Sequence, residues 1–306
     1  MTIKVVPNID SKCIKRFFEF VKERHAIYIR RTRGDPWPWT DDLILQAYKF
    51  TNVFRELDTG TIWLRENILE PYADHPELLF NIALYRHYNY WPLAEEILGK
   101  FGMVDDINRG IEPFHDLIEF VRKYKIKYGR AFTGAHMINC MRGMDKIMYV
   151  FGVSAFDFWM NRHRLWKADD TLKSTFNRIL SIIGYGPFLS YEVVTDLRHT
   201  KYLKDAGDIM TWANPGPGAQ RGVLRLCDIS NFKDSAHPPS VDISFCIDVM
   251  RHLLDKSVGY MPDWMPLLEM RDIEHSLCEW DKYERVRLGQ GRPRSKYRPP
   301  IVWRQV

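Results

Sequence analysis

The spacing of hydrophobic residues predicts helices along most of the chain. Apolar side chains recur at intervals of three and four residues, the period of an amphipathic helix, over 14–31, 59–69, 75–88, 91–101 and 111–129. The pattern continues over 41–58, where Thr40 is a suitable N-cap and acidic residues fill the first turn. Strand-like alternation is sparse, so the sequence predicts a mainly α fold.

Glycine and proline mark the breaks between the predicted helices. Pro36 and Pro38 separate the first two helices because proline is excluded from a helix interior. Further helices are predicted over 171–182, 188–197, 240–254 and 261–287. The sequence has no internal repeat and no clear linker. We therefore expect one α-helical domain over 1–306, built as one body or as two helical lobes, with an irregular, basic Gly/Pro/Arg-rich tail over 288–306.

Positive charge gathers near the two ends of the chain. The 306 residues carry a net charge of +5, and Lys and Arg outnumber Asp and Glu over 12–33 and again over 281–298. Such a distribution indicates a surface for a polyanion such as DNA, although solvated charge that keeps the protein soluble is the alternative interpretation. Aromatic residues make up 14% of the chain and supply rings for stacking as well as for the core.

The composition excludes several classes of protein. The five cysteines are scattered and form no CxxC pair, so neither a zinc ribbon nor a disulfide framework is indicated. The N-terminus has no long apolar segment of the secretory type, and no apolar run is long enough to span a bilayer. We expect a protein of the reducing cytoplasm or nucleus that has no membrane partner.

The segment GYGPFLSYEVVTD is the first candidate site. Gly184 and Gly186 form a tight turn between two predicted helices, and such a turn can direct backbone N–H groups at a phosphate. DNA glycosylases of the helix-hairpin-helix class resemble this arrangement, with an acidic residue after the turn. Pro187 and the short gap to Asp196 depart from their pattern. Asp196 is thus a candidate catalytic acid or base, or else a helix-end or salt-bridge carboxylate.

The segment NPGPGAQRG is the second candidate. Gly216 and Gly218 permit close approach of the backbone, and Arg221 can bind a phosphate through two nitrogens. The segment lacks the Lys-Ser/Thr pair of a nucleotide-binding P-loop, and GxxxxGK[ST] occurs nowhere in the chain. An autonomous P-loop kinase is therefore not indicated.

A predicted helix near the C-terminus is the third candidate. His275, Glu279 and Lys282 recur at helical spacing close to one face. A histidine beside carboxylates suits a metal site or general acid–base catalysis, whereas a solvated helix is the alternative. Arg285 and Arg292 follow in the same basic stretch and join Lys282 as candidate phosphate contacts.

The fourth candidate lies near the N-terminus, among aromatic residues. Trp39, Asn52, Arg55 and Glu56 could form a pocket for a flat polar ligand such as a nucleobase. The alternative is a core helix with its polar face in water.

These four segments together resemble one known family. The matching residues are ERHAIYIRRTRGDPWPWTDDLILQAYKFTNVFRELD, FTGAHMI, GYGPFLSYEVVTDL, NPGPGAQRG and DIEHSLCEWDKYERVRLGQGRPR. They resemble the alpha-glutamyl/putrescinyl thymine pyrophosphorylase group, which includes the helical domain of 5-hydroxymethyldeoxyuridine (5-hmdU) DNA kinases and the amino acid:DNA transferases of bacteriophages. The resemblance implies a glycosylase-like helix-hairpin-helix fold that acts on modified thymine in phage DNA, with the base flipped into a pocket.

The resemblance also implies a reaction. An amine or amino acid would displace pyrophosphate from 5-pyrophosphoryloxymethyldeoxyuridine in DNA, with Mg²⁺ entering through the pyrophosphate and no other cofactor indicated. The expected partners are DNA that contains modified thymine, the amine co-substrate and a 5-hmdU DNA kinase, all in the cytoplasm of the host of a phage. Two alternatives stay open: a glycosylase or lyase acting on a modified base, and a non-catalytic DNA-binding module that accompanies the kinase.

Overall fold

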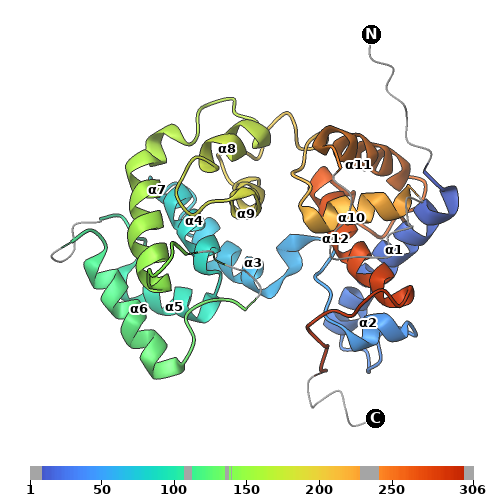
Figure 1. The fold of residues 1–306 in the computed structure, drawn as a ribbon, viewed down its shortest axis with the longest axis horizontal. Helices are drawn as coiled ribbons and strands as arrows, with labels where there is room; N and C mark the ends of the chain where they lie inside the picture. Colours follow the sequence, from blue (N-terminus) through green and yellow to red (C-terminus); the bar gives the residue numbers. More distant parts are fainter. Residues whose placement is uncertain (1–8, 107–111, 135–137, 139, 228–240, 300–306) are drawn as a thin grey trace. The chain divides into compact units, whose positions relative to one another are not determined.

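The computed structural model describes residues 9–106, 112–134, 138, 140–227 and 241–299 (Figure 1). Among these residues the regular elements are helices, no strand occurs, and one isolated antiparallel bridge pairs Tyr48 with Lys296. The mainly α prediction is confirmed, whereas the helix-hairpin-helix architecture stays a prediction. None of the described helices is long and apolar enough to cross a membrane.

The chain forms two compact units. Unit 1 comprises Met1–Asp58 and Ile209–Val306, and unit 2 comprises Thr59–Asp208. The elements of unit 1 are α1 (Ser11–Arg33), α2 (Leu43–Ala47), η1 (Arg55–Leu57), α10 (Pro217–Leu226), α11 (Ile243–Ser257) and α12 (Met270–Arg287). Because unit 1 combines the two ends of the chain, the two basic stretches belong to the same unit.

The elements of unit 2 surround one completely buried helix. They are α3 (Thr59–Leu64), η2 (Arg65–Leu69), α4 (Leu78–Tyr88), α5 (Trp91–Phe101), α6 (His115–Tyr128), η3 (Met148–Ser154), α7 (Ala155–Asn161), η4 (Arg162–Arg164), α8 (Leu172–Ile179) and α9 (Pro187–Leu197). Every residue of α4 is buried, and this helix packs against η2, η3, α7 and α9. The core of unit 2 therefore lies around α4.

Local signals explain where α1 begins and ends. The side chain of Asp10 accepts a hydrogen bond from the backbone N–H of Lys12 at 2.9 Å and caps the helix. Gly34 ends the helix in the left-handed conformation with φ 83°, which glycine adopts without steric cost. Phe17 and Phe20 of the buried face contact Trp280 of α12. This aromatic contact joins the N-terminal helix to the C-terminal one.

The prediction of a helix over 41–58 is wrong beyond the first turn and a half. Asp42 caps α2, which ends at Ala47, and Tyr48 is extended with φ −124° and ψ 152°. The backbone N–H of Lys49 donates to the carbonyl of Ser295 at 3.1 Å, and that of Tyr297 donates to the carbonyl of Ala47 at 2.9 Å. Pairing with the C-terminal segment thus overrides the helical spacing, and residues 48–58 form a loop.

The helix predicted over 261–287 is also too long. Pro266 lies inside the predicted span, and α12 begins only at Met270. A capping box between Glu269 and Asp272 fixes this start. The predicted start of the preceding helix at Ser240, and residues 300–306 of the predicted irregular tail, lie outside the described residues.

Two glycines of α10 allow this helix to approach α12 closely. A Cβ atom at Gly218 would lie 2.3 Å from Sγ of Cys278, and one at Gly222 would lie 2.4 Å from the backbone oxygen of Leu277. These glycines therefore serve helix packing. At Gly216, in contrast, the nearest atom would be Oε1 of Glu274 at an ordinary 3.7 Å.

We predict that Gly222→Ala destabilises unit 1 by about 2 kcal/mol or more, because the added methyl group meets backbone that cannot rotate away. Gly216→Ala, in the same segment, is the matched control and should cost less than about 1 kcal/mol. Chemical denaturation followed by circular dichroism checks both values. Equal effects of the two substitutions would contradict the packing role of Gly222.

Candidate functional site

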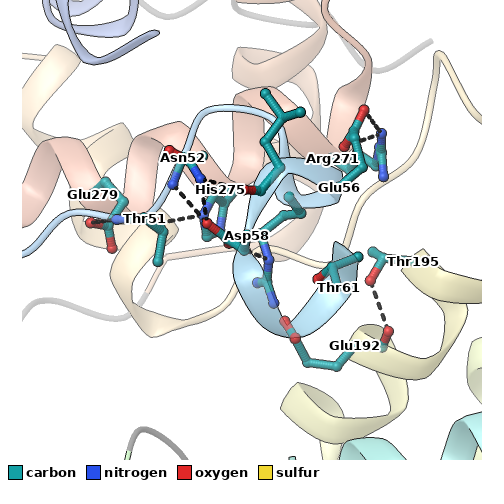
Figure 2. A network of polar contacts seen from close by, with 12 residues as sticks. Thr51, Asn52, Glu56, Asp58, Thr61, Glu192, Thr195, Arg271, His275 and Glu279 are labelled. Carbon is teal, nitrogen blue, oxygen red and sulfur yellow. Dashed lines mark hydrogen bonds and ion pairs between the residues drawn. The ribbon is translucent and has the colours of Figure 1, made fainter. Parts of the chain in front are cut away.

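A polar cluster forms in unit 1 where the loop of residues 48–58 meets α12 (Figure 2). Thr51 Oγ1 lies 2.5 Å from Nε2 of His275, and the backbone N–H of Thr51 donates to Oε2 of Glu279 at 3.1 Å. Lys282 Nζ pairs with the same Glu279 oxygen at 2.6 Å. The predicted spacing of His275, Glu279 and Lys282 thus brings all three side chains into one group, which we call the α12 cluster together with Thr51.

The α12 cluster combines groups that exchange protons with groups that hold them in place. His275 and Thr51 are half-buried, whereas Glu279 is buried. Lys282 also donates to the carbonyl of Lys49 at 3.0 Å and lies 4.9 Å from the ring centroid of Phe50. An imidazole that contacts a hydroxyl group next to a carboxylate–ammonium pair can accept or donate a proton near neutral pH.

Asn52 is engaged within the same loop. Its side-chain oxygen accepts a hydrogen bond from Arg24 at 2.8 Å, and its side-chain nitrogen donates to Leu57 O at 2.8 Å and to Asp58 Oδ1 at 2.9 Å. Burial lowers the pKa of Arg24 to about 10, although Asp58 opposes that shift. Asn52, predicted to read a base, therefore fixes the loop in this conformation.

Glu56 and Arg55 also have partners in unit 1. Arg271 donates to both carboxylate oxygens of Glu56, at 3.0 and 2.9 Å, and Arg55 Nε lies 3.6 Å from Asp58. The neighbouring Asp272 is fully buried, and burial raises its pKa to about 7 although Arg271 opposes the shift. The predicted base-binding residues thus belong to a network that ties the loop to the first turn of α12.

Trp39 lies in a different part of unit 1. Its indole nitrogen donates to the carbonyl of Asp35 at 2.7 Å, and its ring is buried and meets Trp37 edge-on at 5.1 Å. It lines a cavity of about 500 Å³ together with Arg30 and Thr40. The ring supports the wall of this cavity.

The second glycine-rich segment lies against a neighbouring face of α12. The backbone N–H of Gly216 donates to Oε1 of Glu274 at 3.1 Å, and Gly218 packs on Cys278. Arg221 pairs with Asp281 at 2.8 Å, and Arg285 lies 3.4 Å from the same carboxylate. Arg292 is exposed beyond the end of α12. Of the predicted phosphate contacts, the structure therefore brings Arg221 and Arg285 together.

Asp196 occupies the core of unit 2. Arg86 donates to both oxygens of its carboxylate, with Nη2 at 2.7 Å from Oδ1, and both side chains are buried. Arg86 also donates to Thr61 at 3.0 Å and to Asn89 at 3.2 Å. Burial would lower the pKa of Arg86, but the charge of Asp196 raises it above its ordinary value. The predicted catalytic carboxylate thus forms a buried bidentate ion pair.

The glycine turn before α9 lies beside a cavity of unit 2. The cavity has a volume of about 370 Å³ and is lined by His87, Ile138, Tyr149, Ile182, Gly184, Tyr185, Gly186, Pro187, Phe188 and Leu189. Gly184 has φ 86°, and a Cβ atom there would lie 2.1 Å from Ser154 Oγ. Gly186 meets no atom within 4 Å of its Cβ position. The fold therefore requires glycine at 184, whereas space is open at 186.

The family of the chain follows from comparison with known proteins. The sequence model of the family described as "5-hmdU DNA kinase, helical domain" matches residues 11–292. The chain belongs to this family. The 5-hmdU DNA kinase of Bacillus phage SP10 is 23% identical over 299 residues, which cover 87% of this chain and 44% of that protein. The chain thus spans less than half of this relative's length. No solved structure matches the chain.

Membership of the 5-hmdU DNA kinase helical-domain family confirms the family part of the resemblance found in the sequence. The pyrophosphorylase or transferase subfamily stays a prediction. In this member of the family, the described residues include no group of three or more His, Cys, Asp or Glu that could hold a metal ion. That Mg²⁺ binds together with pyrophosphate stays a prediction.

The structure adds residues that sequence reasoning missed. Thr51 stands between aromatic residues and gives no signal of its contact with His275. Arg86 could have been found, since a charge within an otherwise apolar helix needs a buried partner. Asp281 contacts arginines of two helices, and only the packing of α10 on α12 reveals this position.

We predict that Asp196→Asn destabilises unit 2 by about 3 kcal/mol, because it leaves the buried charge of Arg86 without its counterion. Glu119→Gln, which breaks the exposed pair of Glu119 with Arg122 on α6, is the control and should leave the free energy of unfolding nearly unchanged. Chemical denaturation measures both. A stable but inactive Asp196→Asn protein would instead indicate that Asp196 takes part in the reaction.

We predict that Asp272 makes stability fall as pH rises. Its folded-state pKa of about 7 exceeds the ordinary value of 3.8, so the folded protein holds a proton that the unfolded chain has lost in this window. The stability that this carboxyl group contributes is therefore fully present below pH 3.8 and is lost as the pH rises towards about 7. Asp272→Asn keeps a neutral side chain. The free energy of unfolding of this variant, relative to that of wild type, should increase by about 1 kcal/mol or more from about pH 5 to about pH 8.

The measurement is the free energy of unfolding of both proteins at the two pH values. Arg271, Glu56 and Glu269 are the charged groups around Asp272 and remain unchanged in the variant. Asp248→Asn on α11, where the carboxyl group is 39% exposed, is the control. A pH-independent difference between wild type and Asp272→Asn would contradict the raised pKa.

Proposed function

We propose that this chain modifies thymine-derived bases in DNA. It would transfer an amine or amino acid onto 5-pyrophosphoryloxymethyldeoxyuridine with release of pyrophosphate. The family of the chain supports a base-directed role. The observation that carries the transferase activity is the α12 cluster, where an accessible imidazole lies 2.5 Å from a hydroxyl group.

The proposed reaction is a displacement at the methylene carbon of the base. The ammonium group of the co-substrate loses a proton to the hydroxyl oxygen of Thr51, which passes its own proton to Nε2 of His275, and the nitrogen lone pair of the amine then forms a bond to the methylene carbon. The bond from this carbon to the pyrophosphate oxygen breaks, and pyrophosphate leaves with the electron pair. Removal of the proton is required because an ammonium group has no lone pair with which to attack.

The other members of the α12 cluster would orient the imidazole. Thr51 holds the ring through its hydroxyl group, and Glu279 holds Thr51 through the backbone N–H. Lys282 balances the charge of Glu279 at 2.6 Å. We expect Mg²⁺ to enter only as the counterion of pyrophosphate, whose oxygens it prefers. A 5-hmdU DNA kinase in the host cytoplasm would supply the phosphorylated base.

A non-catalytic DNA-binding module is the second candidate function. The observation that favours it is the internal pairing of the predicted reactive residues, since Asn52, Glu56 and Asp196 all bind other side chains of their own unit. In that case the basic surface of unit 1 would bind DNA while the kinase performs the chemistry. The two candidates differ in whether this chain alone changes the DNA.

We predict that mixing the protein, pyrophosphorylated 5-hydroxymethyluracil DNA and a panel of amines yields a new amine-bearing nucleoside in mass spectra. His275→Gln should lower its rate of formation by roughly 10²-fold or more, because it removes the proton acceptor. His252→Gln on α11 of the same unit is the matched control and should leave the rate unchanged.

Three results would contradict the transferase. DNA binding with no adduct from any amine would favour the non-catalytic module. Abasic sites in the DNA would identify a glycosylase or lyase. An adduct that forms equally fast with His275→Gln would keep the reaction but remove His275 from it.

A further inference from the structure

Two arginines of unit 1 meet on one buried carboxylate oxygen. Nε of Arg221 on α10 lies 2.8 Å from Oδ2 of Asp281, and Nε of Arg285 on α12 lies 3.4 Å from the same atom. Arg225 holds the other oxygen, Oδ1, at 2.8 Å. Asp281 is completely buried, so a single negative charge faces three guanidinium groups from inside the fold.

Arg221 and Arg285 use only part of their hydrogen-bonding capacity. Each contacts Asp281 through Nε, and within the described part of the chain their terminal nitrogens make no side-chain hydrogen bond. Their side chains are 22% and 25% exposed, whereas that of Arg225 is 2% exposed. Two partly exposed cations thus share one carboxylate, which leaves positive charge at this surface.

The packing of α10 on α12 holds the two arginines in place. Gly218 and Gly222 flank Arg221 and allow the close approach of the helices described above. Asp281 then accepts a hydrogen bond from Nε of Arg221 and lies at an ion-pair distance of 3.4 Å from Nε of Arg285. The pair is therefore ordered before any ligand binds, which reduces the entropy lost on binding.

We propose that Arg221 and Arg285 form a phosphate clamp that binds a phosphodiester group of the DNA backbone. Guanidinium nitrogens match the geometry of phosphate oxygens and bond them in pairs. An oxyanion at this surface would also neutralise the charge that Asp281 leaves uncompensated. Asp281 is a positioning residue of the clamp. The choice of DNA as the source of the phosphate rests on the proposed function.

The position of the clamp on α12 distinguishes a backbone phosphate from the leaving pyrophosphate. Asp281 and Arg285 face α10, whereas His275 and Glu279 face the loop of residues 48–58. Residues 275 and 285 are about 80° apart around a helix of 3.6 residues per turn, and about 15 Å apart along it at 1.5 Å per residue. A pyrophosphate that leaves a carbon beside His275 would be about three turns of α12 away from Arg285, while DNA can extend over both positions at once.

The test measures binding of the full-length chain to a short DNA duplex by fluorescence anisotropy over a series of salt concentrations. Arg285→Gln and Arg221→Gln should each weaken binding roughly tenfold and lower the slope of log affinity against log salt by about 1. Arg251→Gln on α11 is the matched control, because Arg251 is an exposed arginine of the same unit that pairs with Asp248. It should leave the affinity and the slope unchanged.

Arg285→Lys separates the fork geometry from the charge. It should keep the salt slope and recover only part of the affinity, because an ammonium group does not match two phosphate oxygens. Inorganic pyrophosphate is the second probe and should compete with DNA equally well for wild type and for both Gln variants. Unchanged folding of each variant is verified by its circular dichroism spectrum and unfolding midpoint.

Several outcomes would overturn the clamp or change its ligand. Unchanged affinity and slope in both Gln variants would refute it, whether or not an amine adduct forms. Competition by pyrophosphate that is lost in Arg285→Gln would assign the site to the leaving group instead of to DNA. If no amine adduct forms but the slopes fall as expected, the transferase proposal fails while the clamp stands.

Discussion

The organisation of unit 1 depends on the burial of carboxylates along α12. Five acidic residues of this helix are buried: Asp272, Glu274, Glu279, Asp281 and Glu284. A buried ionised carboxylate costs several kcal/mol unless a donor or cation compensates it, so each must be met by a neighbour or keep its proton. The neighbours come from α10, α1, the loop of residues 48–58 and α12 itself. The position of these elements around α12 is thus an electrostatic requirement as much as a hydrophobic one (Figure 1).

The same requirement explains what the glycine-rich segments do. In NPGPGAQRG, Gly218 and Gly222 bring α10 close enough for Arg221 to reach Asp281, so the segment acts on phosphate only through an arginine that it helps to position. In GYGPFLSYEVVTD, Gly184 supplies a positive φ and avoids Ser154. Gly186 has open space beside it and leaves backbone accessible at the cavity. Similar sequence patterns therefore serve packing in one place and access in another.

The sequence predicted the class of fold and much of one site, and its errors have a common cause. Helical spacing was sufficient for α1 and for the alignment of His275, Glu279 and Lys282, because those features depend on residues close in the chain. Residues 48–58 kept that spacing but form a loop in which only η1 is helical, since Lys49 pairs with the distant Ser295. Asn52 and Asp196 looked available for chemistry, yet their partners Arg24 and Arg86 lie 28 and 110 residues away in the sequence. Single-sequence patterns do not reveal such long-range pairs.

Burial and pairing together separate residues that hold the fold from residues that can act on a ligand. Asp196 and Arg86 satisfy each other in the core of unit 2, so a change in either alters stability before it alters chemistry. His275 is half-buried and contacts the hydroxyl group of Thr51, so its ring lies at the boundary between the packed interior and solvent. Arg221 and Arg285 pair with buried Asp281 through Nε, and their side chains remain partly exposed. A reactive group thus sits at the edge of the buried network, where the fold fixes its position without using all of its bonds.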